Sequence, residues 1–127
     1  MRVLIADDQK SVGVTLAVLV ERCGHEVVQV VGSGLEAIQA YTRLQPDLVL
    51  MDYSMPRLNG ATACRMILAK NPNARIILVT GAAPVGAIAD SGALAILPKP
   101  LGLEQLYAAL YDAGSPRTAP PEEEGGA

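Results

Sequence analysis

Short apolar runs alternate with amphipathic stretches along the chain, and this alternation predicts its secondary structure. The runs are mostly free of polar residues, which is typical of strands buried on both faces of a parallel sheet. The predicted strands cover residues 2–6, 26–31, 47–51, 75–79 and 94–97. Because strands and helices take turns along the chain, the pattern predicts an α/β fold.

Apolar residues with helical spacing follow most of the predicted strands. The first helix ends near Gly24. Its apolar positions are Val12, Leu16, Leu19, Val20 and Cys23. Ser33 and Glu36 have the spacing of a capping box, so a second helix begins there. A third helix covers residues 61–70, and the last begins after Pro100. The predicted apolar face of this last helix consists of Leu103, Leu106, Tyr107, Leu110 and Tyr111.

This order of elements brings polar residues to one edge of the predicted sheet. Right-handed crossovers place the carboxyl ends of parallel strands on the same edge, where open α/β sheets form their sites. Asp7 and Asp8 follow the first strand, and Asp52 follows the third. Thr80 and Lys99 follow the fourth and fifth strands. We therefore expect these residues, which are distant in sequence, to form one site.

Three neighbouring carboxylates predict a site for a hard cation. Mg²⁺ prefers oxygen ligands and is usually held by one or two carboxylates together with phosphate oxygens and water. Asp8 and Asp52 are expected to bind it directly, and Asp7 through water. Asp52 is also placed to attack phosphorus as a nucleophile. Lys99 would neutralise charge on the transferred group, and the Thr80 hydroxyl would donate a hydrogen bond to it.

Four pieces of the sequence, taken in order, resemble the receiver domain of two-component response regulators over about residues 2–113. They are Val3 to Asp8, Leu48 to Asp52 with Met55-Pro56 and Gly60, Val79-Thr80-Gly81, and Lys99-Pro100. The resemblance implies a flavodoxin-like, doubly wound, five-stranded parallel sheet of order 2-1-3-4-5. It also implies a signalling receiver rather than an enzyme that turns over added substrates.

The resemblance gives a role to each acid. It implies that Asp52 takes phosphate from a phosphohistidine on a sensor histidine kinase or a histidine phosphotransfer protein. Asp8, Asp52 and the backbone carbonyl of Ser54 match the Mg²⁺ ligands of the family, and Asp7 assists them.

The remaining site residues also match the family. Thr80 and Lys99 match the residues that sense the phosphoryl group and pair with it. In the family the bond after this lysine is commonly cis, so a cis peptide bond is expected between Lys99 and Pro100. Phosphorylation would then change binding to a downstream protein, which the sequence does not name.

Two features depart from the family pattern. Ile96 stands where the family usually has an aromatic residue that rotates inward on phosphorylation. The segment from Thr80 to Lys99 is about one helical turn shorter than is common. Residues 81–93 have poor helix propensity and predict a shortened or irregular fourth helix. Both departures fall on the usual output surface and leave the predicted acceptor site intact.

Composition narrows the remaining possibilities. The 127 residues fit one domain, and we predict a receiver domain over residues 1–113 followed by a disordered, acidic and proline-rich tail, 114–127. The net charge of −3 does not favour direct binding to nucleic acid. The chain has no run of about 18 apolar residues, so we expect a cytoplasmic protein without membrane insertion. Cys23 and Cys64 are expected to be small buried hydrophobes, and His25 a surface residue.

Several alternatives stay open at this point. Asp7 and Asp8 could cap a helix, Asp52 could be a turn residue, and Lys99 could be a solvated surface lysine. A pseudo-receiver, with the fold but without phosphotransfer, is an alternative that Ile96 favours. A phosphohydrolase of the haloacid dehalogenase type is disfavoured, because the residue two after Asp52 is serine and not a second aspartate.

Overall fold

One five-stranded parallel sheet forms the centre of the protein, whose computed structural model describes residues 1–81 and 90–114. The strands lie in the order β2-β1-β3-β4-β5, which confirms the predicted fold. Their bounds are β1 (Arg2–Ala6), β2 (Glu26–Val31), β3 (Leu48–Asp52), β4 (Ile76–Thr80) and β5 (Ala95–Pro98). The last three begin and end one residue later than predicted, so Asp52 and Thr80 are themselves the terminal residues of their strands. Most of the segment predicted as an irregular fourth helix lies outside the described residues.

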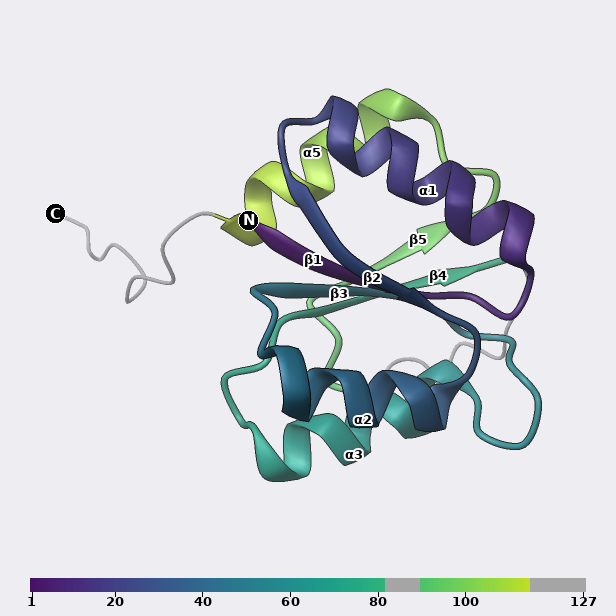
Figure 1. Ribbon diagram of the computed structural model, residues 1–127, viewed down its shortest axis with the longest axis vertical. Helices are drawn as coiled ribbons and strands as arrows, with labels where there is room; N and C mark the ends of the chain where they lie inside the picture. The colour runs from purple at the N-terminus through teal and green to yellow at the C-terminus, as the bar shows by residue number, and fades with distance from the viewer. Residues whose placement is uncertain (82–89, 115–127) are drawn as a thin grey trace, which may run out of the picture.

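Helices cover both faces of the sheet (Figure 1). One face carries α1 (Lys10–Arg22) and α5 (Leu103–Gly114), and the opposite face carries α2 (Gly34–Leu44) and α3 (Gly60–Lys70). The last helix ends one residue beyond the predicted domain boundary. In the described part of the chain, no helix is long and apolar enough to cross a membrane.

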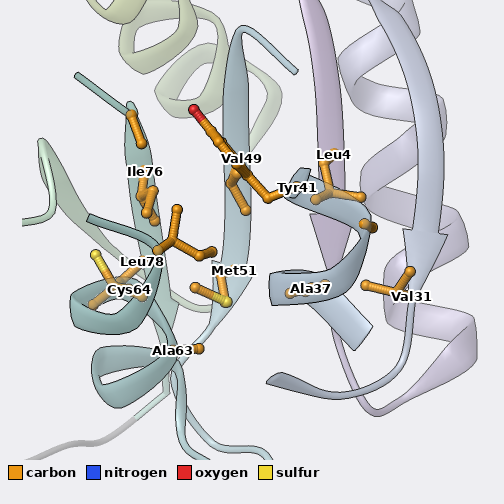
Figure 2. Close-up of a cluster of buried hydrophobic side chains, with 14 of the residues drawn as sticks. Leu4, Val31, Ala37, Tyr41, Val49, Met51, Ala63, Cys64, Ile76 and Leu78 are labelled. Carbon is orange, nitrogen blue, oxygen red and sulfur yellow. The ribbon is translucent and has the colours of Figure 1, made fainter. Parts of the chain in front are cut away.

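Alternate residues of the central strands enter two separate hydrophobic clusters. Val3 and Ile5 of β1 pack on the side of α1 and α5. Leu4 of the same strand points to the opposite side, toward α2 and α3, where it meets Val49 of β3 and other residues of that cluster (Figure 2). This double burial is the reason why these strands read as continuous apolar runs in the sequence.

The last helix buries only part of its predicted apolar face. Leu106 and Leu110 are fully buried, whereas Leu103, Tyr107 and Tyr111 are exposed. The two sets form adjacent stripes, each with a spacing of four residues, and a helix packed on a flat sheet can bury only one stripe completely. The five residues therefore share one helix face, as predicted, but the sheet covers only the stripe of Leu106 and Leu110.

The two cysteines differ in their surroundings, and neither forms a disulfide. Cys64 on α3 is fully buried, as predicted, and its burial raises the pKa of the thiol to about 11. Cys23 is only half-buried, because it is the residue that caps the carboxyl end of α1 rather than a residue of the helix interior. His25 follows in the turn before β2 and is also half-buried.

The capping box predicted at Ser33 is formed at the start of α2. The Ser33 hydroxyl accepts a hydrogen bond from the Glu36 backbone N–H at 3.1 Å, and the Glu36 carboxylate accepts one from the Gly32 N–H at 3.1 Å. Two backbone donors at the helix start are thus satisfied by side chains.

We predict that Ser33→Ala lowers the free energy of unfolding by about 1 kcal/mol, because the Glu36 N–H loses its acceptor. Denaturant unfolding would measure the change. Ser11→Ala on the exposed side of α1 is the matched control and should stay within about 0.5 kcal/mol of the parent. Equal losses in both variants would contradict the role of the Ser33 cap.

Candidate functional site

The register of the sheet brings the predicted site residues together. Ala6 of β1 pairs with Met51 of β3, so the next residues, Asp7 and Asp52, lie side by side at the ends of neighbouring strands. Asp52 pairs with Val79 of β4, which places Thr80 one position further along on the other side of Asp52. The carboxyl edge of the sheet therefore collects these side chains, as the sequence predicts.

Three acids form a cluster at this edge. Asp7, Asp8 and Asp52 can each offer a carboxylate oxygen, and these oxygens lie within 4.8 Å of one another. Asp7 and Asp52 are buried, whereas Asp8 is exposed. Oxygen donors at this spacing, open to solvent on one side, fit a hard divalent cation that keeps some of its water.

Lys99 follows the edge strand β5, and its side chain extends past the end of β4 to this cluster. Its ammonium lies 3.1 Å from Asp52 Oδ1 and 3.3 Å from Asp7 Oδ2. The Lys99 backbone N–H donates to the Thr80 carbonyl at 2.9 Å, which fixes the base of the side chain beside β4. The Lys99–Pro100 peptide bond is cis, as expected. These contacts remove the alternative in which Lys99 is a solvated surface residue.

Burial and charge act in opposite directions on the two central groups. Burial of Asp52 raises its pKa, the Asp7 charge adds to this, and the hydrogen bond and charge of Lys99 only partly oppose it. Burial acts to lower the pKa of Lys99, but the hydrogen bonds and charges of Asp52 and Asp7 together outweigh it and raise that pKa. The ammonium therefore stays charged, and the Asp52 carboxylate lies in a site that does not fully compensate its charge.

The loop after β3 is held close to Asp52 by backbone contacts. Tyr53 N–H donates to the Val79 carbonyl at 2.8 Å, and Gly60 N–H donates to the Tyr53 carbonyl at 2.7 Å. Ser54 N–H donates to Asp52 Oδ1 at 3.3 Å, so the loop turns around the carboxylate itself. This turn keeps Ser54, whose carbonyl was predicted as a metal ligand, next to the cluster.

The structure gives little support to helix capping as the purpose of Asp7 and Asp8. The residue that caps α1 is Gln9, and its side chain makes no capping hydrogen bond. Asp7 Oδ1 instead accepts from the Gln9 N–H at 2.9 Å, which holds the carboxylate at the sheet edge. The other oxygen of Asp7 faces Lys99. Both oxygens thus serve to position the acid within the cluster.

Three neighbours of the cluster were not recognised as part of it from the sequence. Gly60 matched the family motif, but the reason for glycine appears only in the fold: a Cβ there would lie 2.3 Å from the Asp52 carbonyl oxygen. Lys10 and Val14 of α1 line a cavity of about 250 Å³ that also borders Asp7 and Asp8. In the sequence, only the position of Lys10 directly after the acids indicated that it lies near them. His25, predicted as a surface residue, does not line this cavity.

Comparison with known proteins agrees with this geometry. Residues 3–111 match the response regulator receiver domain. The chemotaxis protein CheY of Listeria monocytogenes is 31% identical over 116 residues, which cover 89% of this chain and 98% of that protein. A response regulator receiver domain protein from Clostridium thermocellum has a similar structure, with a TM-score of 0.81, 27% identity, and coverage of 88% of this chain and 92% of that one.

The fold alone is shared with a more divergent structure, the CheX–CheY–BeF₃–Mg complex from Borrelia burgdorferi. Its TM-score is 0.85 at 24% identity, covering 91% of this chain and 90% of the other. The match to the receiver domain over residues 3–111, together with the likeness to the Listeria protein, shows that the chain belongs to the response regulator receiver domain family. It is a signalling module of two-component systems, and its acidic cluster has the chemistry of a site for Mg²⁺.

We predict that Gly60→Ala lowers the free energy of unfolding by about 1–3 kcal/mol, because the added methyl group forces the β3–α3 loop away from the Asp52 backbone. Gly102→Ala is the control, since a Cβ at Gly102 would meet no heavy atom within 4 Å. Chemical denaturation of both variants would measure the difference. The same unfolding midpoint for the two variants would show that the close approach at Gly60 is not needed.

A second prediction concerns pH in metal-free buffer. Because the pKa of Asp52 is raised above its ordinary value of 3.8, the folded state holds the proton to higher pH than the unfolded state does. Tighter proton binding by the folded state stabilises it at low pH, and this stabilisation is lost as the pH rises from about 3.8 through the raised pKa. In the Asp52→Asn variant the side chain at this position does not titrate, so the variant has no such loss of stability as the pH rises.

Asp52→Asn should therefore become more stable relative to the parent as the pH rises from about 3 to 7. Thermal unfolding in the presence of a chelator, with both proteins measured at each pH, would show the gap widening. A stability difference that is the same at every pH would mean that Asp52 does not titrate as described.

Proposed function

We propose that the chain is a phosphoacceptor that takes a phosphoryl group on Asp52 from a phosphohistidine of a sensor histidine kinase or a histidine phosphotransfer protein. The observation that carries this proposal is the position of the Lys99 ammonium, in contact with both Asp52 and Asp7. A buried carboxylate beside a fixed cation and two further acids is suited to phosphoryl transfer. The same arrangement has no evident purpose in holding the fold together.

The transfer requires only a short sequence of events at Asp52. A carboxylate oxygen of Asp52 attacks phosphorus, the bond from phosphorus to the donor nitrogen breaks, and the electron pair leaves with the imidazole, which takes up a proton. The product is an aspartyl phosphate. Charge on the phosphoryl oxygens is the main obstacle, so positioning and neutralisation provide most of the catalysis.

In this proposal the metal ligands are Asp8, Asp52 and the Ser54 carbonyl, with Asp7 assisting through water. When bound, Mg²⁺ supplies positive charge against the phosphoryl oxygens. Lys99 supplies the second positive group, already held at 3.1 Å from the acceptor. The Thr80 hydroxyl, at the end of the neighbouring strand, donates to a phosphoryl oxygen.

Phosphorylation adds a charge of about −1.5 to −2 at Asp52 and changes the partners of Lys99 and Thr80. We propose that this shifts an equilibrium between two conformations of the loops beside β4 and β5, and so changes binding to a downstream protein. The receiver unit is assigned to residues 1–113. Ile96, in place of the usual aromatic residue, is 43% exposed, so the response is carried without a buried aromatic reporter.

A second candidate function is that of a pseudo-receiver, which binds a partner without accepting phosphate. Ile96 is the observation that favours it, because the usual aromatic reporter of phosphorylation is missing. The complete set of acids with Lys99 favours the acceptor instead. The two functions differ in one measurable event, the covalent change at Asp52.

We predict that incubation with Mg²⁺ and a small acyl phosphate or phosphoramidate adds one phosphoryl group, read by intact mass. Asp52→Asn should show no gain, because the amide is not a nucleophile toward phosphorus. Asp112→Asn, an exposed acid on α5, is the matched control and should react like the parent. Lys99→Met should slow the gain by about 10²-fold or more, since it removes one of the two positive groups.

Each outcome separates the candidates. A gain that requires both Asp52 and Mg²⁺ supports the phosphoacceptor. No gain with any donor, in a chain that melts cooperatively, supports the pseudo-receiver. Continuous release of phosphate from an unrelated phosphate monoester would point to a hydrolase and overturn both.

A further inference from the structure

A groove runs along the exposed side of α5, away from the acidic cluster. It consists of two adjoining cavities of about 430 Å³ and about 230 Å³, both lined by Cys23 and Tyr107. The larger one extends to Met1, Tyr111 and Gly114. The smaller one extends to the first residues of α5, Leu103 and Glu104, and to Arg22 at the end of α1.

Aromatic side chains are concentrated in this groove. The chain has four tyrosines and no phenylalanine or tryptophan, and two of the tyrosines line the groove. Tyr107 is 55% exposed and Tyr111 is 67% exposed, while Leu103 continues the same stripe at 45%. Exposed aromatic residues beside a concave apolar surface are typical of a site that binds another segment of polypeptide.

The chain leaves the described structure at the mouth of this groove. Arg75 holds the end of α5, because its guanidinium donates to the Ala113 carbonyl at 2.7 Å. Gly114 packs so closely on Met1 that a Cβ there would lie 3.3 Å from the Met1 sulfur. Gly114, the last described residue, also lines the larger cavity, so the described part of the chain ends at the groove.

The sequence that follows has the chemistry that aromatic grooves recognise. Residues 115–121 read Ser-Pro-Arg-Thr-Ala-Pro-Pro, with no large apolar side chain that could enter a hydrophobic core. Proline-rich segments favour the extended polyproline II helix and bind to grooves lined by aromatic residues. Their low conformational freedom reduces the entropy cost of such binding.

The length of the segment also fits. From Gly114 back to Leu103, α5 extends about 16 Å at 1.5 Å per residue. Residues 115–121 in polyproline II form span about 22 Å at 3.1 Å per residue, which is enough to reverse direction and follow the groove. Because the segment is tethered at the groove, its effective concentration there is in the millimolar range, and weak contacts suffice to hold it.

We propose that the groove between the end of α1 and α5 is a polyproline-binding site, and that residues 115–121 of the same chain occupy it. Pro116, Pro120 and Pro121 pack against Tyr107 and Tyr111. The bound segment covers the side chain of Cys23, which lies in both cavities. The proposal does not require that Asp52 accepts a phosphoryl group.

Cys23 offers a direct test in the full-length chain. The rate of its modification by a thiol reagent is measured by mass spectrometry, while buried Cys64, with a pKa of about 11, serves as the internal reference. The variant P116S/P120S/P121S should react about threefold faster than the parent or more, because the groove is left open. Tyr107→Ser should raise the rate similarly, and combining the changes should add little further.

The matched control is E122Q/E123Q/E124Q, which changes the same tail just beyond the proposed segment. It should react at the parental rate, and the protection of the parent should not depend on protein concentration. The proposal is overturned if Cys23 reacts at the same rate in P116S/P120S/P121S and in the parent. It is also overturned if Cys23 loses its protection in the glutamine variant. Protection that grows with protein concentration would also overturn it, because a second copy would then be the occupant.

Discussion

Repulsion among three close carboxylates is the constraint on which the rest of this structure depends. Asp7 and Asp52 are buried side by side and need a compensating cation. Among the described residues, the cation within hydrogen-bonding distance of these acids is Lys99, which follows the last strand, whereas the acids lie at the ends of the first and third strands. The fold can therefore satisfy the acids only when the whole sheet has formed in the order β2-β1-β3-β4-β5. The site can therefore form only together with the strand order of the sheet. This explains why the side chains of residues so distant in sequence lie within hydrogen-bonding distance of one another.

Much of this arrangement is predictable from sequence because it follows from periodicity and handedness. Apolar runs locate the strands, right-handed crossovers fix the common edge, and Asp7, Asp52 and Lys99 then meet at that edge. Contacts between elements are harder to predict from the sequence. The distance between Gly60 and the Asp52 carbonyl depends on how a loop folds back, and no local pattern encodes it. The exposed stripe with Tyr107 on α5 was also missed, because an apolar pattern shows that side chains share a helix face but not how much of that face the sheet can cover.

The sheet connects two regions that serve different purposes. Its carboxyl edge holds the acidic cluster, and the opposite edge holds Met1 and the end of α5. Between them, Leu106 and Leu110 of α5 pack into the same buried cluster as Ile5 and Leu50, whose strands lead directly to the acids. Close packing of this kind transmits small displacements, since close-packed interiors have few voids that could absorb them. A change at the acids and a change along α5 thus act on a shared set of contacts.

The outer strand β5 has a consequence of its own. Strands at the edge of a sheet present unpaired backbone groups that can recruit a strand from another molecule. Here the strand has only four residues and ends at Pro98, and Pro100 follows closely. Because Lys99 N–H is directed toward β4, the neighbouring nitrogen of Pro98 lies on the outward side, where proline has no hydrogen to donate. The residues that place the site lysine therefore also discourage edge-to-edge aggregation of the protein.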